Sequence, residues 1–348
     1  MTCKNCFPTE LEYEILIEGE RNQSYIPDIV QHLKRQKVLI LDRKTSFFIK
    51  EAGIVELYEF FRDHLDTSLI RFRVDNGKWR PIIEVDELFQ SQWIDKVIRE
   101  QLVTCYYQPI VDVEGNVYGY EVLSRFFDEL GNPIPPIEAF KAAKLRNRMY
   151  SLDRVCRLNA VQQSSFINQK VFINFVPTSI YSPEHCLRST VQLAQQLGID
   201  PSNFVFEVVE TEQVEDLEHL KSILMYYQEK GFKYALDDVG QGFSSMDVLK
   251  ELNPHYMKLD MKYVQGVSKD KRKQESAKNF LEAATETGAI PLAEGIEEID
   301  DFLWLRKMGY QLFQGYLFGK PTPRIIQNSQ SYHFADQYGQ VGVSHGKN

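Results

Sequence analysis

The fold of this chain is indicated by three short runs in its second half: VFIN at residues 171–174, FVFE at 204–207 and YALDD at 234–238. Each run is a strand-like apolar segment that ends in polar side chains. Stretches with helical spacing separate the runs. Short strands that alternate with helices predict repeated βα units and a parallel sheet.

The same alternation extends outward from these runs in both directions. Strands are expected at 106–111, 118–123, 171–176, 204–208, 234–238, 256–260, 290–294 and 311–314, and helices at 151–166, 184–197, 212–230, 245–252, 271–287 and 300–308. The first two strands are joined by a link so short, with a turn at 114–116, that they must form an antiparallel hairpin. We therefore predict a TIM-like (β/α)8 barrel with one antiparallel strand over residues 96–325.

Residues 1–95 show a different pattern of expected strands and helices. Strands are expected at 12–17, 38–42, 46–50, 69–74 and 81–85, and helices at 26–36 and 54–65. This pattern predicts a small α+β domain, and because it contains no catalytic constellation, we interpret it as a regulatory, sensory or dimerising module. Residues 326–348 are polar and lack apolar periodicity, so we expect a flexible tail there.

The composition is that of a globular protein. The chain has 348 residues, of which 43% are hydrophobic and 26% charged. A net charge of −9 argues against nucleic-acid binding, since no excess of cations meets the phosphates. No leader and no apolar run of membrane-spanning length is found, so we expect a cytoplasmic protein without a membrane partner.

The cysteine content also favours the cytoplasm. Five cysteines, an odd number in a long chain, fit a reducing compartment better than a disulfide scaffold. Cys3 and Cys6 form a single CxxC motif, which leaves open half of a zinc site or a redox pair.

Nearly every expected barrel strand carries a polar residue at or near its end. These residues are Glu121, Asn174, Glu207, Asp237, Asp238, Lys258, Glu294 and Gln314. In a β/α barrel the carboxyl ends of the strands meet at one mouth, where active sites are built. Five converging carboxylates would repel one another unless cations neutralise them, and one lysine is too little. The sequence therefore predicts a site for hard divalent cations such as Mg²⁺ or Mn²⁺.

Two kinds of chemistry fit a lysine at a barrel strand end. Lys258 could form a Schiff base in an aldolase, but that reading leaves the carboxylates unexplained. Two metal ions with a lysine fit phosphoryl chemistry better, and the adjacent Asp237 and Asp238 favour one carboxylate that bridges two ions.

Several segments of the chain resemble a known family, the EAL-domain phosphodiesterases that hydrolyse cyclic di-GMP. They are YQPIV at 107–111, GYEVLSRF at 119–126, Asn174, FEVVE at 206–210, LDDVGQGFSS at 236–245, KLD at 258–260, AEGIE at 293–297 and QGY at 314–316. They follow the family's order and spacing over residues 100–325, about two thirds of the chain.

The resemblance implies roles for individual residues. Glu121, Asn174, Glu207 and Asp237 match ligands of a first metal ion, and Asp237, Asp238 and Glu294 match those of a second. The matched catalytic positions are Lys258, Glu294 and Gln314, and the matched substrate-binding positions are Gln108, Leu123, Arg125 and Asp260. The positions that match loop movement and dimer coupling are Glu210, Gly240, Gly242, Ser244 and Glu297.

The sequence departs from the family pattern without losing a ligand. Val122 replaces the alanine of the signature triplet, and the loop at 237–242 reads DDVGQG where the family commonly has DDFGTG. Val176 and Val209 stand where the family often has serine and threonine. We expect little effect of Val122, whereas the other changes bear on loop dynamics, dimer coupling and rate; none of them removes a ligand.

The expected function is that of a metal-dependent phosphodiesterase in bacterial second-messenger signalling. It would open cyclic di-GMP to linear pGpG by attack of water activated by two Mg²⁺ or Mn²⁺ ions, and it would act as a homodimer. Two alternatives stay open: a catalytically silent cyclic di-GMP receptor or protein-interaction module, and a barrel phosphodiesterase for another nucleotide.

Overall fold

The structure is a computed structural model, and it describes residues 10–75, 77–208, 217–237 and 246–325. The chain packs into two compact units. The first comprises residues up to 103 together with 125–155, and the second comprises 104–124 together with the chain from 156 onward. The boundary at residue 95 stays a prediction; by packing, residues 125–155 group with the N-terminal part. Cys3, Cys6 and the tail at 326–348 lie outside the described residues.

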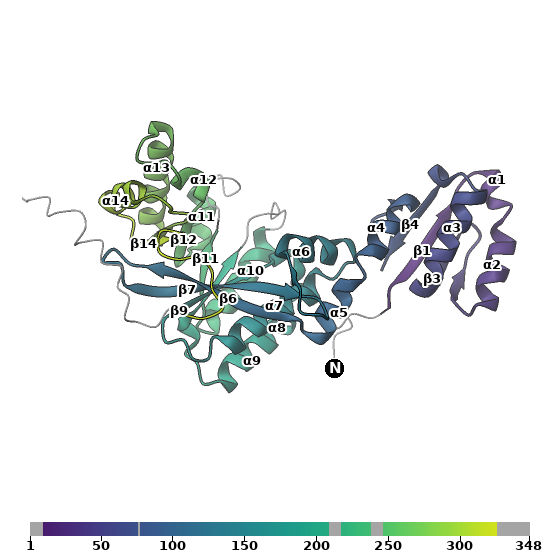
Figure 1. Cartoon of the computed structure of the whole chain (residues 1–348), viewed down its shortest axis with the longest axis horizontal. Helices are drawn as coiled ribbons and strands as arrows, with labels where there is room; N and C mark the ends of the chain where they lie inside the picture. Colours follow the sequence, from purple (N-terminus) through teal and green to yellow (C-terminus); the bar gives the residue numbers. More distant parts are fainter. Residues whose placement is uncertain (1–9, 76, 209–216, 238–245, 326–348) are drawn as a thin grey trace, which may run out of the picture. The chain divides into compact units, whose positions relative to one another are not determined.

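The first unit is built on an antiparallel sheet with the order β2-β3-β1-β4-β5. Its strands are β1 (Glu12–Ile17), β2 (Leu39–Asp42), β3 (Ser46–Lys50), β4 (Ile70–Val74) and β5 (Arg80–Pro81). Its first helices are α1 (Glu20–Gln23), α2 (Ile26–Arg35) and α3 (Ile54–His64), with 3₁₀ turns at Glu51–Gly53 and Thr67–Leu69. The helices α1 and α2 link β1 to β2, and α3 links β3 to β4, which is the split βαβ arrangement (Figure 1). The predicted α+β domain is confirmed.

Alternation along the strands sets the core of this unit. Tyr13, Ile15 and Ile17 of β1 are fully buried on one face, where they join a cluster with residues of α2 and α3 such as Leu33 and Phe61. Burial of one sheet face against two amphipathic helices explains why the sequence pattern located these elements well.

The strand expected at 81–85 is wrong. Only Arg80–Pro81 is paired, as β5, and a 3₁₀ turn at Ile82–Glu84 leads into α4 (Val85–Gln90). Ile82, Val85 and Leu88 are almost completely buried, and their three-residue spacing places them on one side of a helical segment. The helical spacing therefore overrides the strand propensity of the β-branched residues.

The remaining elements of the first unit come from two parts of the sequence. After α4 follows α5 (Trp93–Glu100), and the later part contributes the end of β7 (Val117–Phe127), β8 (Pro133–Ile134), α6 (Pro136–Leu145) and the start of α7 (Met149–Gln163). The sequence pattern did not predict α4, α5 or α6.

The second unit contains the barrel. Its strands are β6 (Val103–Val111), β7, β9 (Lys170–Phe175), β10 (Phe204–Val208), β11 (Lys233–Leu236), β12 (Tyr256–Leu259), β13 (Ile290–Ala293) and β14 (Leu312–Gln314). The sheet runs β6-β14-β13-β12-β11-β10-β9-β7, and pairing of β6 with β7 closes it. β6 is antiparallel to β14, while β7, β9, β10, β11, β12, β13 and β14 are parallel neighbours in that order. The predicted TIM-like barrel with one reversed strand is confirmed.

Helices follow most barrel strands. They are α7, α8 (Pro183–Cys186), α9 (Arg188–Gln196), α10 (Leu217–Glu229), α11 (Met246–Leu252), α12 (Met261–Val264), α13 (Lys271–Thr287) and α14 (Ile299–Met308), with 3₁₀ turns at Pro177–Ser179 and Pro201–Asn203. The helix expected at 184–197 is interrupted at Leu187, and the short α12 was not predicted.

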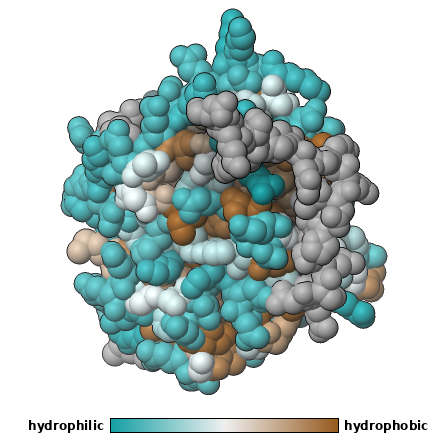
Figure 2. All heavy atoms as spheres, turned by 90° about the vertical axis from the view of Figure 1, so that its left-hand side faces the viewer, coloured by the Kyte–Doolittle hydropathy of each residue, from teal (hydrophilic) through white to brown (hydrophobic). Residues whose placement is uncertain are grey.

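The face of the molecule that Figure 2 shows is mostly hydrophilic. Figure 2 shows one face on which apolar residues form small separate patches among hydrophilic ones. Exposed large apolar side chains such as Leu130 and Tyr181 are scattered along the sequence, which is normal for a protein surface. Among the described residues, no helix combines the length and apolar character needed to cross a bilayer.

Candidate functional site

A layer of polar side chains lies two residues beyond the apolar layer inside the barrel. The apolar layer includes Ile110, Phe172, Val205, Ala235, Tyr256, Leu292 and Leu312. Two positions further along the parallel strands are Asn174, Glu207, Asp237, Lys258, Glu294 and Gln314; in the reversed β6 the polar residue, Gln108, is two positions before Ile110. Because side chains two apart share a sheet face, the strand pattern itself aims these groups inward.

Glu121 of β7 is held by two amides. Asn174 Nδ2 donates a hydrogen bond of 2.8 Å to Glu121 Oε1, and Gln314 Nε2 donates one of 2.6 Å to Oε2. The same Gln314 nitrogen lies 3.2 Å from Gln108 Oε1, and Gln108 Nε2 donates to the carbonyl of Gly319. Strands β6, β7, β9 and β14 thus meet through their side chains at one place.

Lys258 of β12 forms ion pairs with three other carboxylates. Its Nζ lies 2.8 Å from Glu207 Oε1 and 3.6 Å from Asp237 Oδ1, and it forms a third ion pair with Glu294. Lys258 is almost fully buried, which disfavours its charge, but Asp237, Glu207 and Glu121 outweigh this effect and raise its pKa above the ordinary value. A firmly protonated amine is a poor nucleophile, so this environment disfavours the Schiff-base alternative.

The carboxylates are not fully satisfied by these contacts. Glu207 Oε2 and Gln314 Oε1 are buried without a hydrogen-bond partner in the described part of the chain, whereas Glu207 Oε1 and Glu294 Oε1 both depend on the ammonium of Lys258. Burial raises the pKa of Glu207 well above its ordinary value, and Glu121 and Asp237 add to this, although Lys258 acts in the opposite direction. For Glu121, burial also acts to raise the pKa, but Lys258, Gln314 and Asn174 lower it below the ordinary value.

The chemistry of this cluster fits a hard divalent cation. As they are placed, the described His, Cys, Asp and Glu side chains form no group of three or more that could hold a metal ion, and Lys258 lies between the carboxylates. However, four carboxylates (Glu121, Glu207, Asp237, Glu294) face this single lysine. The candidate ligand atoms are carboxylate and amide oxygens, and two of them, Glu207 Oε2 and Gln314 Oε1, lack a hydrogen-bond partner among the described residues. Mg²⁺ and Mn²⁺ prefer such oxygen ligands.

Other expected site residues lie at the edge of this cluster or elsewhere. Leu123 is half-buried in β7, and Asp260 caps α12 by accepting from the Lys262 backbone N–H at 2.9 Å. Arg125 is half-buried and packs with the first unit, and Glu297 accepts from Gln265 Nε2 at 3.3 Å. Asp238, Glu210, Gly240, Gly242 and Ser244 lie outside the described residues. All these roles stay predictions.

Two glycines that sequence reasoning did not single out position the site residues. A Cβ on Gly295, which follows Glu294 and has φ +69°, would lie 2.3 Å from Met261 Cβ. A Cβ on Gly315, which follows Gln314, would lie 2.0 Å from the Ile296 carbonyl oxygen. Only glycine permits this close approach, so the dipeptides Glu-Gly and Gln-Gly were a usable sequence signal.

Comparison with known proteins places the chain in a family. The model of the EAL domain matches residues 91–321. The chain is 25% identical to the cyclic di-GMP phosphodiesterase PdeR of Escherichia coli (strain K12), over 75% of this chain and 41% of that protein. It is 27% identical to the cyclic di-GMP phosphodiesterase PdeA of Borreliella burgdorferi, over 89% of this chain and 49% of that protein. The chain thus spans less than half the length of either relative.

A solved structure gives the same result. The cyclic di-GMP-bound crystal structure of a standalone EAL protein from Vibrio cholerae O395 has 33% sequence identity and a TM-score of 0.56. The likeness covers 63% of this chain and 92% of that protein. Because the family match extends over well more than half of the chain, the chain belongs to the EAL domain family.

Proposed function

We propose that this chain is a metal-dependent phosphodiesterase that opens cyclic di-GMP to linear pGpG. The observation that supports this function best is the meeting of Glu121, Glu207, Asp237 and Glu294 around Lys258, at the strand positions that the family resemblance assigns to catalysis. The names of the curated relatives and the cyclic di-GMP-bound EAL structure support the choice of substrate.

The oxygen ligands divide into two sets in this proposal. Glu121, Asn174, Glu207 and Asp237 would hold one divalent cation, and Asp237 and Glu294, together with Asp238, would hold a second. When bound, such cations polarise a phosphate oxygen and lower the pKa of a water molecule. Asn174 and Gln314 keep Glu121 in place through the two hydrogen bonds that they donate.

Lys258 supplies the permanent positive charge of the site. Its buried ammonium would donate a hydrogen bond to the attacking water or to a non-bridging phosphate oxygen, and it would stabilise the negative charge that grows there. The water oxygen forms one new bond to phosphorus, and one bond from phosphorus to a ribose oxygen breaks. The water releases a proton and the departing ribose oxygen takes one up, so the linear product carries one new phosphate end and one new hydroxyl.

The direct test incubates the purified full chain with cyclic di-GMP, first with Mg²⁺ or Mn²⁺ and then with EDTA, and separates the products by chromatography. We expect pGpG only when the divalent cation is present. If cyclic di-GMP binds but no pGpG forms with either cation, the chain is a receptor and the proposed activity is wrong. If a panel of other cyclic nucleotides is cleaved and cyclic di-GMP is not, the proposed substrate is wrong.

Three finer expectations belong to this proposal. We infer the cytoplasmic location from the cysteine content, and the homodimer and the coupling through the loop at 239–245 from the family resemblance. Size measurement in solution tests the homodimer, and a monomer that turns over at the full rate would contradict the coupling.

A further inference from the structure

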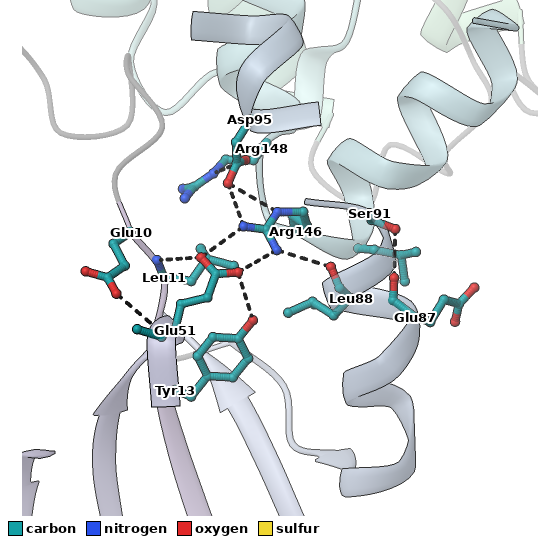
Figure 3. Close-up of polar contacts among 12 residues, drawn as sticks. Glu10, Leu11, Tyr13, Glu51, Glu87, Leu88, Ser91, Asp95, Arg146 and Arg148 are labelled. Atoms are coloured by element: carbon teal, nitrogen blue, oxygen red, sulfur yellow. Dashed lines mark hydrogen bonds and ion pairs between the residues drawn. The ribbon is translucent and has the colours of Figure 1, made fainter. Parts of the chain in front are cut away.

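A second buried cation lies far from the barrel cluster in sequence. Arg146, which follows α6, is fully buried in the first unit. Its guanidinium lies between Glu51, from the 3₁₀ turn before α3, and Asp95 of α5 (Figure 3). The three residues come from the N-terminal sheet region, from the linking helix and from the segment at 125–155, so we call this group the Arg146 clasp.

The contacts of the clasp satisfy almost every donor of the guanidinium. Arg146 Nη1 lies 2.8 Å from Glu51 Oε1 and donates to the Leu88 carbonyl at 3.1 Å. Nη2 donates to Glu51 Oε2 at 3.1 Å and to Asp95 Oδ2 at 2.5 Å, and Nε donates to the same Asp95 oxygen at 3.2 Å. Glu51 is therefore held through both of its oxygens by two guanidinium nitrogens, the strongest geometry for such a pair, and Asp95 accepts from two nitrogens through its Oδ2.

Neighbouring groups donate further hydrogen bonds to Glu51 and Asp95. Tyr13 Oη donates to Glu51 Oε1 at 3.4 Å, and the Leu11 backbone N–H donates to Oε2 at 3.5 Å, so β1 is tied to Glu51 (Figure 3). Arg148 Nε donates to Asp95 Oδ1 at 3.1 Å. Burial lowers the pKa of Arg146, but Asp95 and Glu51 more than compensate, so it stays above the ordinary value.

We propose that the Arg146 clasp couples local unfolding of the N-terminal sheet to local unfolding of α6, so that the two behave as one cooperative unit. Through this coupling the N-terminal domain controls the segment that continues β7. The reason is energetic. Loss of Glu51 as an anion leaves a buried guanidinium with one partner fewer, and breaking a buried pair costs far more than breaking an exposed one. β7 carries Glu121 and leads through β8 to α6, so the chain itself connects the clasp with the candidate active site.

The test compares two changes of glutamate to glutamine, each of which removes an ion pair with α6 or with the residue that follows it. Glu51→Gln breaks the clasp. Glu87→Gln is the matched control, because Glu87 of α4 pairs with Lys141 of α6 at 2.9 Å but both side chains are about half exposed or more. Hydrogen exchange of the full chain is followed by mass spectrometry at the amides of β1 and of α6.

In Glu51→Gln we expect the opening equilibrium of both segments to rise together, by about a hundredfold or more. In Glu87→Gln we expect no change. Unchanged protection of α6 in Glu51→Gln would overturn the proposal, and so would an equal effect of the two variants. If Glu51→Gln does not fold, Glu51→Asp keeps the charge on a shorter side chain; the clasp predicts a smaller joint loss of protection, and a loss confined to β1 would contradict it.

A second measurement concerns control of the reaction and rests on the proposed function. Glu51→Gln should change the turnover of cyclic di-GMP at least twofold, while Glu87→Gln keeps the wild-type value. Equal turnover in Glu51→Gln and the wild type would refute control by the N-terminal domain. If the wild type itself forms no pGpG, the proposed function fails, and the exchange experiment still decides whether the clasp couples β1 to α6.

Discussion

Arg146 and Lys258 are two buried cations that face carboxylates, and they differ in how completely the surrounding groups are satisfied. Arg146 directs all three of its guanidinium nitrogens to acceptors, and both oxygens of Glu51 accept hydrogen bonds. Lys258 faces Glu207, Asp237 and Glu294 with one ammonium, and Glu207 Oε2 and Gln314 Oε1 lack a hydrogen-bond partner in the part of the chain that the structure describes.

This difference separates a structural role from a chemical one. A buried ion pair with matched donors and acceptors holds elements together without any further component. A buried group of four carboxylates with one lysine is destabilising by itself, because each uncompensated charge is costly in the interior. Such a cost is typical of active sites, where the missing interaction comes with the cation and the substrate.

The largest effect should come from Glu121→Ala in the barrel cluster. Loss of this carboxylate removes the acceptor of both Asn174 and Gln314 and one proposed cation ligand. We expect turnover of cyclic di-GMP to fall about a thousandfold or more, since metal and charge stabilisation supply several kcal/mol to the transition state. Steady-state rates measured for Glu121→Ala and for Glu275→Ala, an exposed position in α13, provide the comparison. A rate within tenfold of wild type in Glu121→Ala would remove this residue from the site.

The clasp should show the largest effect on stability. We expect Glu51→Gln to lower the free energy of unfolding of the first unit by about 3–5 kcal/mol, because it leaves Arg146 buried with a weakened partner set. Trp79 and Trp93 belong to this unit and Trp304 to the other, so fluorescence in a Trp304→Phe background reports the first unit in a denaturant titration. A midpoint equal to that of the Trp304→Phe parent would contradict the clasp.

The same change of glutamate to glutamine in the barrel, at Glu207, should not lower the free energy of unfolding. In EDTA, Glu207→Gln should leave the stability of the second unit unchanged or raise it by about 1 kcal/mol, because a neutral amide replaces one of several buried carboxylates that share a single lysine. Turnover should be lost in the same variant. Thermal unfolding followed through Trp304 measures the stability, and a loss as large as that of Glu51→Gln would show that Glu207 is a structural residue.

The smallest effect should be that of Glu87→Gln. Its ion pair with Lys141 is exposed, and water and salt screen such pairs. We expect the unfolding midpoint, the exchange pattern and the turnover to equal the wild-type values. A destabilisation comparable to that of Glu51→Gln would mean that burial is not what distinguishes the clasp.

Sequence reasoning located the barrel cluster because the cluster follows strand periodicity. Asn174, Glu207 and Lys258 each end an apolar strand pattern, and parallel strands bring such ends together, so local pattern and fold give the same answer. The pattern did not indicate that Lys258 contacts Glu207 and Glu294 directly, because these distances depend on side-chain packing.

The clasp gave no sequence signal. Arg146 lies 95 residues from Glu51 and 51 from Asp95, and nothing in the local sequence marks an arginine after a helix as buried. The prediction for the segment at 81–100 was wrong for a related reason. Ile82, Ile83 and Val85 have strand propensity, but packing favours a 3₁₀ turn and α4, which bury Ile82, Val85 and Leu88 on one side. The predicted boundary at residue 95 was placed where the pattern of expected strands and helices changes. The clasp, however, joins residues on both sides of this boundary by ion pairs.

The most direct test of the contrast between the two cations is a titration with Mn²⁺, in which electron paramagnetic resonance measures the free ion. The wild type, Glu121→Ala and Glu51→Gln are compared at equal protein concentration. We predict that the wild type and Glu51→Gln bind Mn²⁺ with similar affinity and that Glu121→Ala binds it at least about tenfold more weakly. Wild-type protein that binds no Mn²⁺, or Glu121→Ala protein that binds it as tightly as wild type, would contradict the assignment of the barrel cluster as a cation site.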